Sequence, residues 1–333
     1  MKKVLFTLAT LALLAGVSSC TKEKEGKYNP KEKIESVYAE AQIYVDDLLD
    51  SQMPKFKSEE WVWEKERLTR ISYYGQAFYY PTDDPEEAQM ERELMYTQLF
   101  TYDEDGRLTK SEILGDVNML ATCEYEGKYL KKMTVTEEDE MVVTYEFTHV
   151  GKRISSFKLT ISGVDFDMDK KVREQLERTN PLRFVLAPEP AKMVTIATKK
   201  GVERAIKSGS KANVVLEFQV SWNDADNVSD MMCNYMGGIV DYSFRYDTKN
   251  NPFYNLFDIV NGIGSEYVPF MPLNKNNVTG IAETVVEPGE TDPEVRVIEF
   301  SFTYNSKDYP TSRKMVEGDE EFRYEETLYY EYK

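Results

Sequence analysis

A short stretch of the sequence, residues 102–110, decides the fold: it reads Tyr-Asp-Glu-Asp-Gly-Arg-Leu-Thr-Lys. An aromatic residue ends one apolar run, an acidic turn with a glycine follows, and a basic and an apolar residue begin the next run. Glycine supplies the positive φ that tight hairpin turns require. The stretch therefore predicts two antiparallel strands joined by a short turn.

Degenerate copies of this stretch recur along the chain. Full or partial copies occupy residues 66–71, 125–133, 147–157, 222–228 and 276–281. The apolar residues that follow three of the turns, Leu108, Leu130 and Ile154, are 22 and then 24 residues apart. This step is the length of two strands and two turns, and hairpins repeated in sequence make an antiparallel meander.

Apolar and polar residues alternate with period two through most of the chain, as in strands with one buried face. The clearest examples are residues 141–148, 214–222, 240–247 and 322–332. We therefore expect a mostly β protein, with a single meander domain over residues 55–333. It should form a barrel-like or strongly curled sheet of about 14–16 strands, because an open sheet of that size would leave exposed edges.

Residues 31–50 are expected to form one amphipathic helix that caps or plugs this sheet. Apolar residues there recur at spacings of three and four. They are Ile34, Val37, Tyr38, Ala41, Val45 and Leu48. Asn29 offers a helix cap, and Pro30 suits the first helical position.

The N-terminus has the pattern of a bacterial lipoprotein signal. Two lysines precede an apolar run of 14 residues over 4–17, and small residues then lead to Cys20. The run is short of the roughly 20 residues that span a bilayer. We expect residues 1–19 to be a cleaved signal peptide, Cys20 to carry a lipid, and residues 20–30 to be a flexible tether. The alternative is an ordinary signal peptide followed by an incidental cysteine.

The composition limits the classes of partner. Without residues 1–19 the chain keeps 39 of its 41 basic residues and all 59 acidic ones, a formal charge of −20. This charge argues against a nucleic-acid partner. Cys123 and Cys233 are the remaining cysteines. An exported protein permits a disulfide between them, but two isolated cysteines are equally well explained as buried apolar residues, which we favour.

Several of these segments together carry a family resemblance over roughly residues 60–332. They are the lipoprotein signal, residues 61–64 before 67–71, the repeats over 96–161, residues 246–254 and residues 276–279. The whole resembles a Bacteroidetes lipoprotein family of unknown function with a porin-like β fold, and the repeat unit also resembles bacterial tyrosine-aspartate repeats. The resemblance implies a barrel-like envelope protein and supplies no catalytic residues. A membrane-spanning barrel is not expected, because charged residues lie on the same strand face as apolar ones, where a lipid face would be. Leu108, Lys110, Glu112 and Leu114 share one such face, and Tyr129, Lys131, Met133 and Val135 share another.

The sequence contains little that indicates catalysis or a cofactor. His149 is the only histidine and is expected to be an exposed turn residue. One histidine and two distant cysteines cannot form a standard zinc site, and no phosphate-binding or dinucleotide motif is present. We therefore predict no catalytic residue and no cofactor. Acidic residues are too numerous for any pair to be singled out as a glycoside-hydrolase pair.

Two groups of residues are candidates for ligand binding. Aromatic residues that could stack on sugar rings are Trp61, Trp63, Tyr79, Tyr80, Phe253 and Tyr254. In a β-rich chain such residues are also typical of core and cross-strand pairs. Asp165, Asp167 and Asp169 match the opening of a calcium loop, but the glycine expected at the sixth position is a lysine. A strand with its aspartates in water explains them more simply.

Three functional hypotheses follow. The preferred one is a lipid-anchored protein of the outer membrane, on the cell surface or the periplasmic side, which binds or assembles with another envelope protein without catalysis. The alternative is a lipoprotein that binds a glycan or another small ligand. The third hypothesis is a glycoside hydrolase that uses paired carboxylates.

Overall fold

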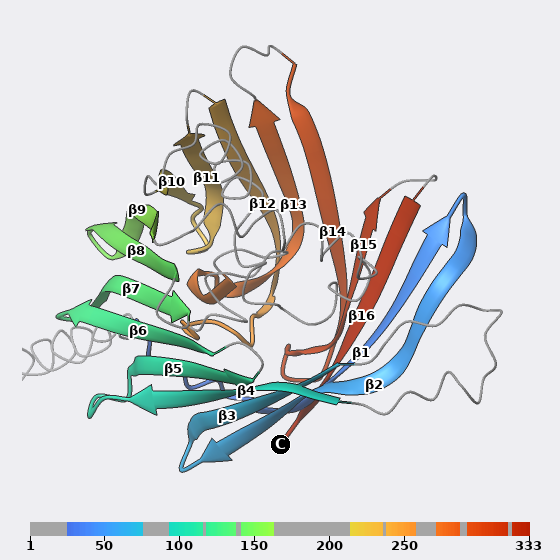
Figure 1. Cartoon of the computed structure of the whole chain (residues 1–333), viewed down its shortest axis with the longest axis horizontal. Helices are drawn as coiled ribbons and strands as arrows, with labels where there is room; N and C mark the ends of the chain where they lie inside the picture. The colour runs from blue at the N-terminus through green and yellow to red at the C-terminus, as the bar shows by residue number, and fades with distance from the viewer. Residues whose placement is uncertain are drawn as a thin grey trace, which may run out of the picture.

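The computed structural model describes residues 25–75, 93–115, 118–137, 141–162, 214–235, 238–257, 271–286, 292–318 and 322–333. These residues form a closed barrel of sixteen strands, each antiparallel to its neighbours in sequence (Figure 1). Closure is made by β1 (Ile34–Val45), which pairs with β16 (Phe322–Tyr332) along its whole length. The predicted antiparallel meander and its barrel shape are confirmed.

The remaining strands follow one another around the wall. They are β2 (Leu48–Glu64), β3 (Arg67–Gly75), β4 (Glu93–Tyr102), β5 (Leu108–Gly115), β6 (Met119–Glu126), β7 (Tyr129–Glu137), β8 (Met141–Val150), β9 (Arg153–Ser162), β10 (Val214–Trp222), β11 (Val228–Tyr235), β12 (Gly238–Asn250), β13 (Asn276–Val286), β14 (Glu294–Tyr304) and β15 (Pro310–Gly318). One short 3-10 helix, Met271–Leu273, lies between β12 and β13.

The helix predicted at residues 31–50 is wrong, because this segment forms β1 and the start of β2. Asp46 and Asp47 join the two strands with φ values of 49° and 59°, the left-handed conformation that two-residue hairpin turns require. The segment also has an apolar residue at every second position, and the buried ones are Val37, Ala39, Ala41 and Ile43. Pairing with strands on both sides selects this second pattern, and the barrel therefore begins before residue 55.

The two ends of the barrel differ in construction. We call one end the turn end: it holds the short turns after β2, β4, β6, β8, β10 and β14, residues 25–33, and the C-terminal residue. The opposite end, which we call the far rim, holds the turn between Val45 and Leu48 and the starts of the other even-numbered strands. Residues 251–257, after β12, add the buried Phe253, Leu256 and Phe257 at the turn end.

The aromatic residue of the sequence repeat has a recurring structural role at the turn end. It lies near the end of an even-numbered strand and donates a hydrogen bond to a main-chain carbonyl near the start of the preceding strand. The six donor–acceptor pairs, at 2.6–2.8 Å, are Trp63–Ile34, Tyr102–Leu68, Tyr125–Leu108, Trp222–Ile154, Tyr246–Val228 and Tyr332–Pro310. Each bond connects an even-numbered strand to the preceding strand at the end of the barrel where no turn joins those two strands. Each bond contributes about 1 kcal/mol.

The basic residue of one repeat packs on the aromatic ring of the next repeat along the chain. The guanidinium carbon of Arg107 is 4.6 Å from the ring centroid of Tyr125, and that of Arg153 is 5.7 Å from Trp222. Such cation–π contacts contribute about 0.5–1 kcal/mol at partly exposed sites. The order of aromatic, turn, basic and apolar residues in the sequence therefore encodes a set of side-chain contacts as well as a hairpin.

The outer wall of the barrel carries ion pairs between strands. Lys158 lies 3.9 Å from Glu146 on the adjacent strand, and Arg245 on β12 reaches past Gly280 on β13 to lie 2.7 Å from Glu299 on β14. These side chains alternate with buried apolar ones such as Phe147, so they point away from the core. Charged groups on a lipid face are strongly unfavourable, so this wall is suited to water. No helix in the described part of the chain is apolar and long enough to cross a membrane.

Candidate functional site

A small cluster of charged side chains lies inside the barrel, next to the closure between β1 and β16. Its members are Glu59 on β2, Arg313 on β15 and Glu326 on β16. The register places Glu326 opposite the buried Ala41 and Met315, so the carboxylate faces the core. Arg313 donates from Nη2 to Glu326 Oε1 at 3.0 Å, and the two side chains are 11% and 7% exposed.

The cluster contains two carboxylates and one guanidinium. Burial raises the pKa of Glu59 to about 7, although the hydrogen bond from Trp61 Nε1, at 2.7 Å, and the charge of Arg313 oppose this shift. Burial also raises the pKa of Glu326, which the charge of Arg313 again opposes. Because desolvation outweighs the attraction of the single cation in the cluster, the pKa of Glu59 lies well above its usual value.

The cavity beside this cluster is small. Phe253, Phe302, Arg313 and Tyr330 contribute to its lining. It has room for about one or two water molecules, which is far less than a sugar ring needs. This cavity is therefore too small to bring a glycoside to the paired acids, and the cluster acts as a buried polar network.

The predicted stacking residues are partly brought together. The ring of Trp61 lies 6.4 Å from that of Trp63 and 6.2 Å from that of Phe253, and Phe253 lies 6.3 Å from Tyr330. Trp61 and Phe253 are buried and Trp63 is half-buried, so these three rings pack mainly on one another and on the core. Tyr254 is half-buried. Tyr79 and Tyr80 lie outside the described residues. Ligand stacking stays a prediction.

Other sequence candidates are placed as follows. Cys20, with the whole signal segment 1–19, and the candidate calcium residues Asp165, Asp167 and Asp169 lie outside the described residues. Cys123 and Cys233 are buried thiols that form no disulfide, which confirms the favoured alternative. Within the described ranges, no three His, Cys, Asp or Glu side chains are grouped so as to hold a metal ion.

The sequence did not predict that residues after the signal segment contact the barrel. Glu25 Oε2 accepts a hydrogen bond from the main-chain nitrogen of Leu130 at 2.7 Å and lies 3.1 Å from His149 Nε2. The main-chain nitrogen of Glu25 also donates to Lys128 at 3.1 Å. Residues 25–30, expected to belong to a flexible tether, therefore lie against the turn end.

His149 is not the exposed turn residue that we expected, because its side chain is 11% exposed and paired with Glu25. The signal that could have identified it is its position in the repeat. His149 precedes Ile154 by five residues, as Tyr125 precedes Leu130. His149 therefore occupies the position of the aromatic residue that donates a hydrogen bond in other copies of the repeat, and the side-chain carboxylate of Glu25 is its partner.

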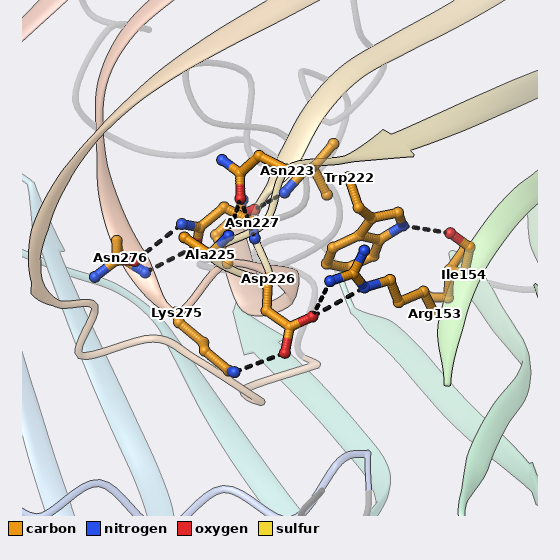
Figure 2. A network of polar contacts seen from close by, with 11 residues as sticks. Arg153, Ile154, Trp222, Asn223, Ala225, Asp226, Asn227, Lys275 and Asn276 are labelled. Atoms are coloured by element: carbon orange, nitrogen blue, oxygen red, sulfur yellow. Dashed lines mark hydrogen bonds and ion pairs between the residues drawn. The ribbon is translucent and has the colours of Figure 1, made fainter. Parts of the chain in front are cut away.

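A polar network around residues 223–227 ties several hairpins together at the turn end (Figure 2). Asp226 accepts hydrogen bonds from Arg153, at 2.5 and 2.9 Å, and from Lys275, at 2.7 Å. These bonds, that of Lys275 first, lower the pKa of Asp226 to about 2. Asn227 Nδ2 donates to Asn276 Oδ1 at 2.9 Å. Side-chain hydrogen bonds thus connect several hairpins at the turn end, where residues 25–33 also lie.

Comparison with known proteins gives structural similarity only. No protein-family model matches the sequence, and no curated protein matches it. Among solved structures, the chain is similar to a porin-like protein from Bacteroides uniformis ATCC 8492, with 10% identity and a TM-score of 0.49 over 93% of this chain and 100% of that one. It also matches TcdB2-TccC3 without its hypervariable C-terminal region, with 11% identity and a TM-score of 0.22 over 87% of this chain and 14% of that one. Similarity at this level assigns neither a family nor an activity.

Proposed function

We propose that this protein is a lipoprotein of the bacterial cell envelope, anchored through a lipid on Cys20, which acts by binding a partner rather than by catalysis. The attachment of Glu25 to the turn end is the observation that carries the proposal. Only five residue steps separate Cys20 from Glu25. Five extended residues reach at most ~18 Å, so a lipid on Cys20 would hold the turn end close to the membrane surface.

The surface and interior of the barrel support a role in water beside that membrane. Ion pairs such as Lys158–Glu146 lie on the outer wall, where a membrane-spanning barrel would present apolar residues. The described interior contains a core of buried apolar side chains, and the cavity beside the charged cluster has room for only about one or two waters. We therefore place recognition on the outer surface of the barrel.

The mass of the N-terminal peptide tests the anchor. The full chain is expressed in bacteria that process lipoproteins, and the membrane fraction is digested with trypsin. We expect the peptide beginning at Cys20 to carry a diacylglyceryl group, and Cys20→Ala to lose both this mass and cleavage after residue 19. Cys123→Ala, which changes a buried thiol of the barrel, serves as the matched control and should keep the modification. A mature chain that begins at an unmodified residue would contradict the proposal.

A further inference from the structure

Two lysines on the outer wall, next to the closure of the barrel, share the ring of one tyrosine. Lys55 and Lys57 belong to β2, and their Nζ atoms lie 5.4 and 5.8 Å from the ring centroid of Tyr38 on β1. The Nζ atom of Lys55 is also 3.7 Å from the ring centroid of Tyr329 on β16. Cation–π contacts therefore hold two ammonium groups close together on this face.

An irregular strand pairing brings Lys55 onto these rings. The β1–β2 pair has three register shifts, more than any other strand pair of the described barrel. At the second shift, the two exposed residues Pro54 and Lys55 lie opposite Glu40 alone. Such a bulge bends its strand and changes the direction of a side chain, and bulges are common next to functional sites. β2 is strongly bent along its length (Figure 1).

The two lysines are not neutralised. Neither ammonium group forms an ion pair with a carboxylate in the part of the chain that the structure describes. By contrast, Arg107 also packs on an aromatic ring but is paired with Asp103 at 2.7 Å. Glu40, on the same face as the lysines, instead accepts a hydrogen bond from the Tyr329 hydroxyl at 2.5 Å. Like charges held together repel each other, so an anion bound beside both ammonium groups would be stabilised.

Hydroxyl groups continue this surface around the wall. Residues that pair across five successive strands form what we call the lysine row: Lys57, Tyr38, Tyr329, Ser312 and Thr303. The row faces outward, because neighbours such as Ala39 and Tyr330 are buried, and it extends over ~19 Å. It contains no aliphatic side chain of the kind that fills the core of a protein interface. Its hydroxyl groups are instead suited to the hydroxyl groups of a saccharide.

We propose that the lysine row, with Lys55, binds a glycan that carries carboxylate or sulfate groups. One anionic group would lie beside Lys55 and Lys57, and sugar hydroxyls would hydrogen-bond along the row toward Ser312. The charge of −20 on the mature chain permits this, because exposed charges more than about 8 Å away are largely screened at physiological ionic strength. The inference rests on the proposed binding role and specifies its surface and its ligand class.

Titration calorimetry of the full-length protein, purified in nonionic detergent from the cells that process it, tests this inference. The acidic probes are polygalacturonate and chondroitin sulfate, and the comparison probes are neutral dextran and polyglutamate. We expect at least one acidic glycan to bind and dextran not to bind. Lys55→Gln and Lys57→Gln should each raise its Kd by at least about tenfold. Lys158→Gln is the matched control, since it makes the same charge change at an ion-paired wall lysine, and should change the Kd by less than about twofold.

Four outcomes would overturn the inference. They are no binding of either acidic glycan, equal binding of dextran, an unchanged affinity in either lysine variant, and tighter binding of polyglutamate, which would indicate an acidic protein as the partner. The melting temperature of each variant shows that the barrel is folded. The mass of the N-terminal peptide, measured on the same samples, reports the anchor separately, so a failed glycan site and a failed anchor can be distinguished.

Discussion

Replacing Glu59 by glutamine is expected to remove a pH-dependent destabilisation of the barrel. The pKa of Glu59 is raised from 4.5 in the unfolded chain to about 7 in the fold. Below pH 4.5 the carboxyl is protonated in both states and contributes nothing. As the pH rises from 4.5 to about 7, the unfolded chain releases the proton while the folded barrel retains it, so the free energy of unfolding falls. At ~1.4 kcal/mol per pKa unit, the loss amounts to ~3 kcal/mol above neutral pH.

Urea unfolding across this pH range measures the effect. Glutamine preserves an acceptor for the Trp61 indole, so the Glu59→Gln variant should equal the wild type in acid and exceed it by ~3 kcal/mol above neutral pH. Glu60→Gln, on the outer face beside Glu59, is the matched control and should follow the wild-type profile. A Glu59→Gln profile that runs parallel to the wild type would refute the buried-carboxylate reasoning.

Three further changes test other parts of the structure by unfolding measurements. Arg313→Met leaves the buried Glu326 without its cation and should lower the free energy of unfolding in urea by ~3–5 kcal/mol at neutral pH. Part of this loss should be recovered in acid, because Glu326 then takes up a proton. An unchanged unfolding midpoint would contradict the importance of the Arg313–Glu326 pair. Tyr125→Phe removes the hydrogen bond to the start of the preceding strand and should lower the free energy of unfolding by ~1 kcal/mol. Tyr129→Phe removes an exposed hydrogen bond and should lower it by less. Equal losses would contradict a special structural role for the aromatic residue of the repeat. Asp226→Asn removes a carboxylate whose pKa is lowered from 3.8 to about 2, so its contribution is present above pH 3.8 and lost as the pH falls through about 2. Because this ion pair is partly exposed, thermal unfolding at neutral pH should show a loss of only ~1 kcal/mol that vanishes in strong acid.

The hairpin turns and the strand order could be predicted from the sequence because the information is local. Each repeat contains its own turn residues, such as Gly106 and Gly127 at φ values of 79° and 60°. The conformation of residues 31–50 is not determined by local sequence. Their apolar residues satisfy both the helical and the strand spacing, and pairing with β16, almost 300 residues away, decides between them.

The interior cluster could not be identified from the sequence for a related reason. Glu59, Arg313 and Glu326 come together only when the barrel closes, and nothing local distinguishes these acids from the rest of the 59. Alternation within β2 is the one available hint, since it places Glu59 on the same face as the buried Trp61. His149 was open to prediction through its place in the repeat, but its partner Glu25 belongs to a segment that the repeat does not include.

The orientation of the barrel on its membrane tests the anchored-lipoprotein proposal most directly. Val150 at the turn end and Leu48 at the far rim are 72% and 73% exposed, so cysteines at these two positions can be labelled equally with a fluorescent donor, while Cys123 and Cys233 are buried. A strand of about ten residues is roughly 30 Å long, so labels at the two ends of the barrel would lie at clearly different heights above the membrane. With the lipidated protein in vesicles that contain an acceptor lipid, we predict strong energy transfer from Val150→Cys and weak transfer from Leu48→Cys. Equal transfer from both labels, or stronger transfer from Leu48→Cys, would contradict it.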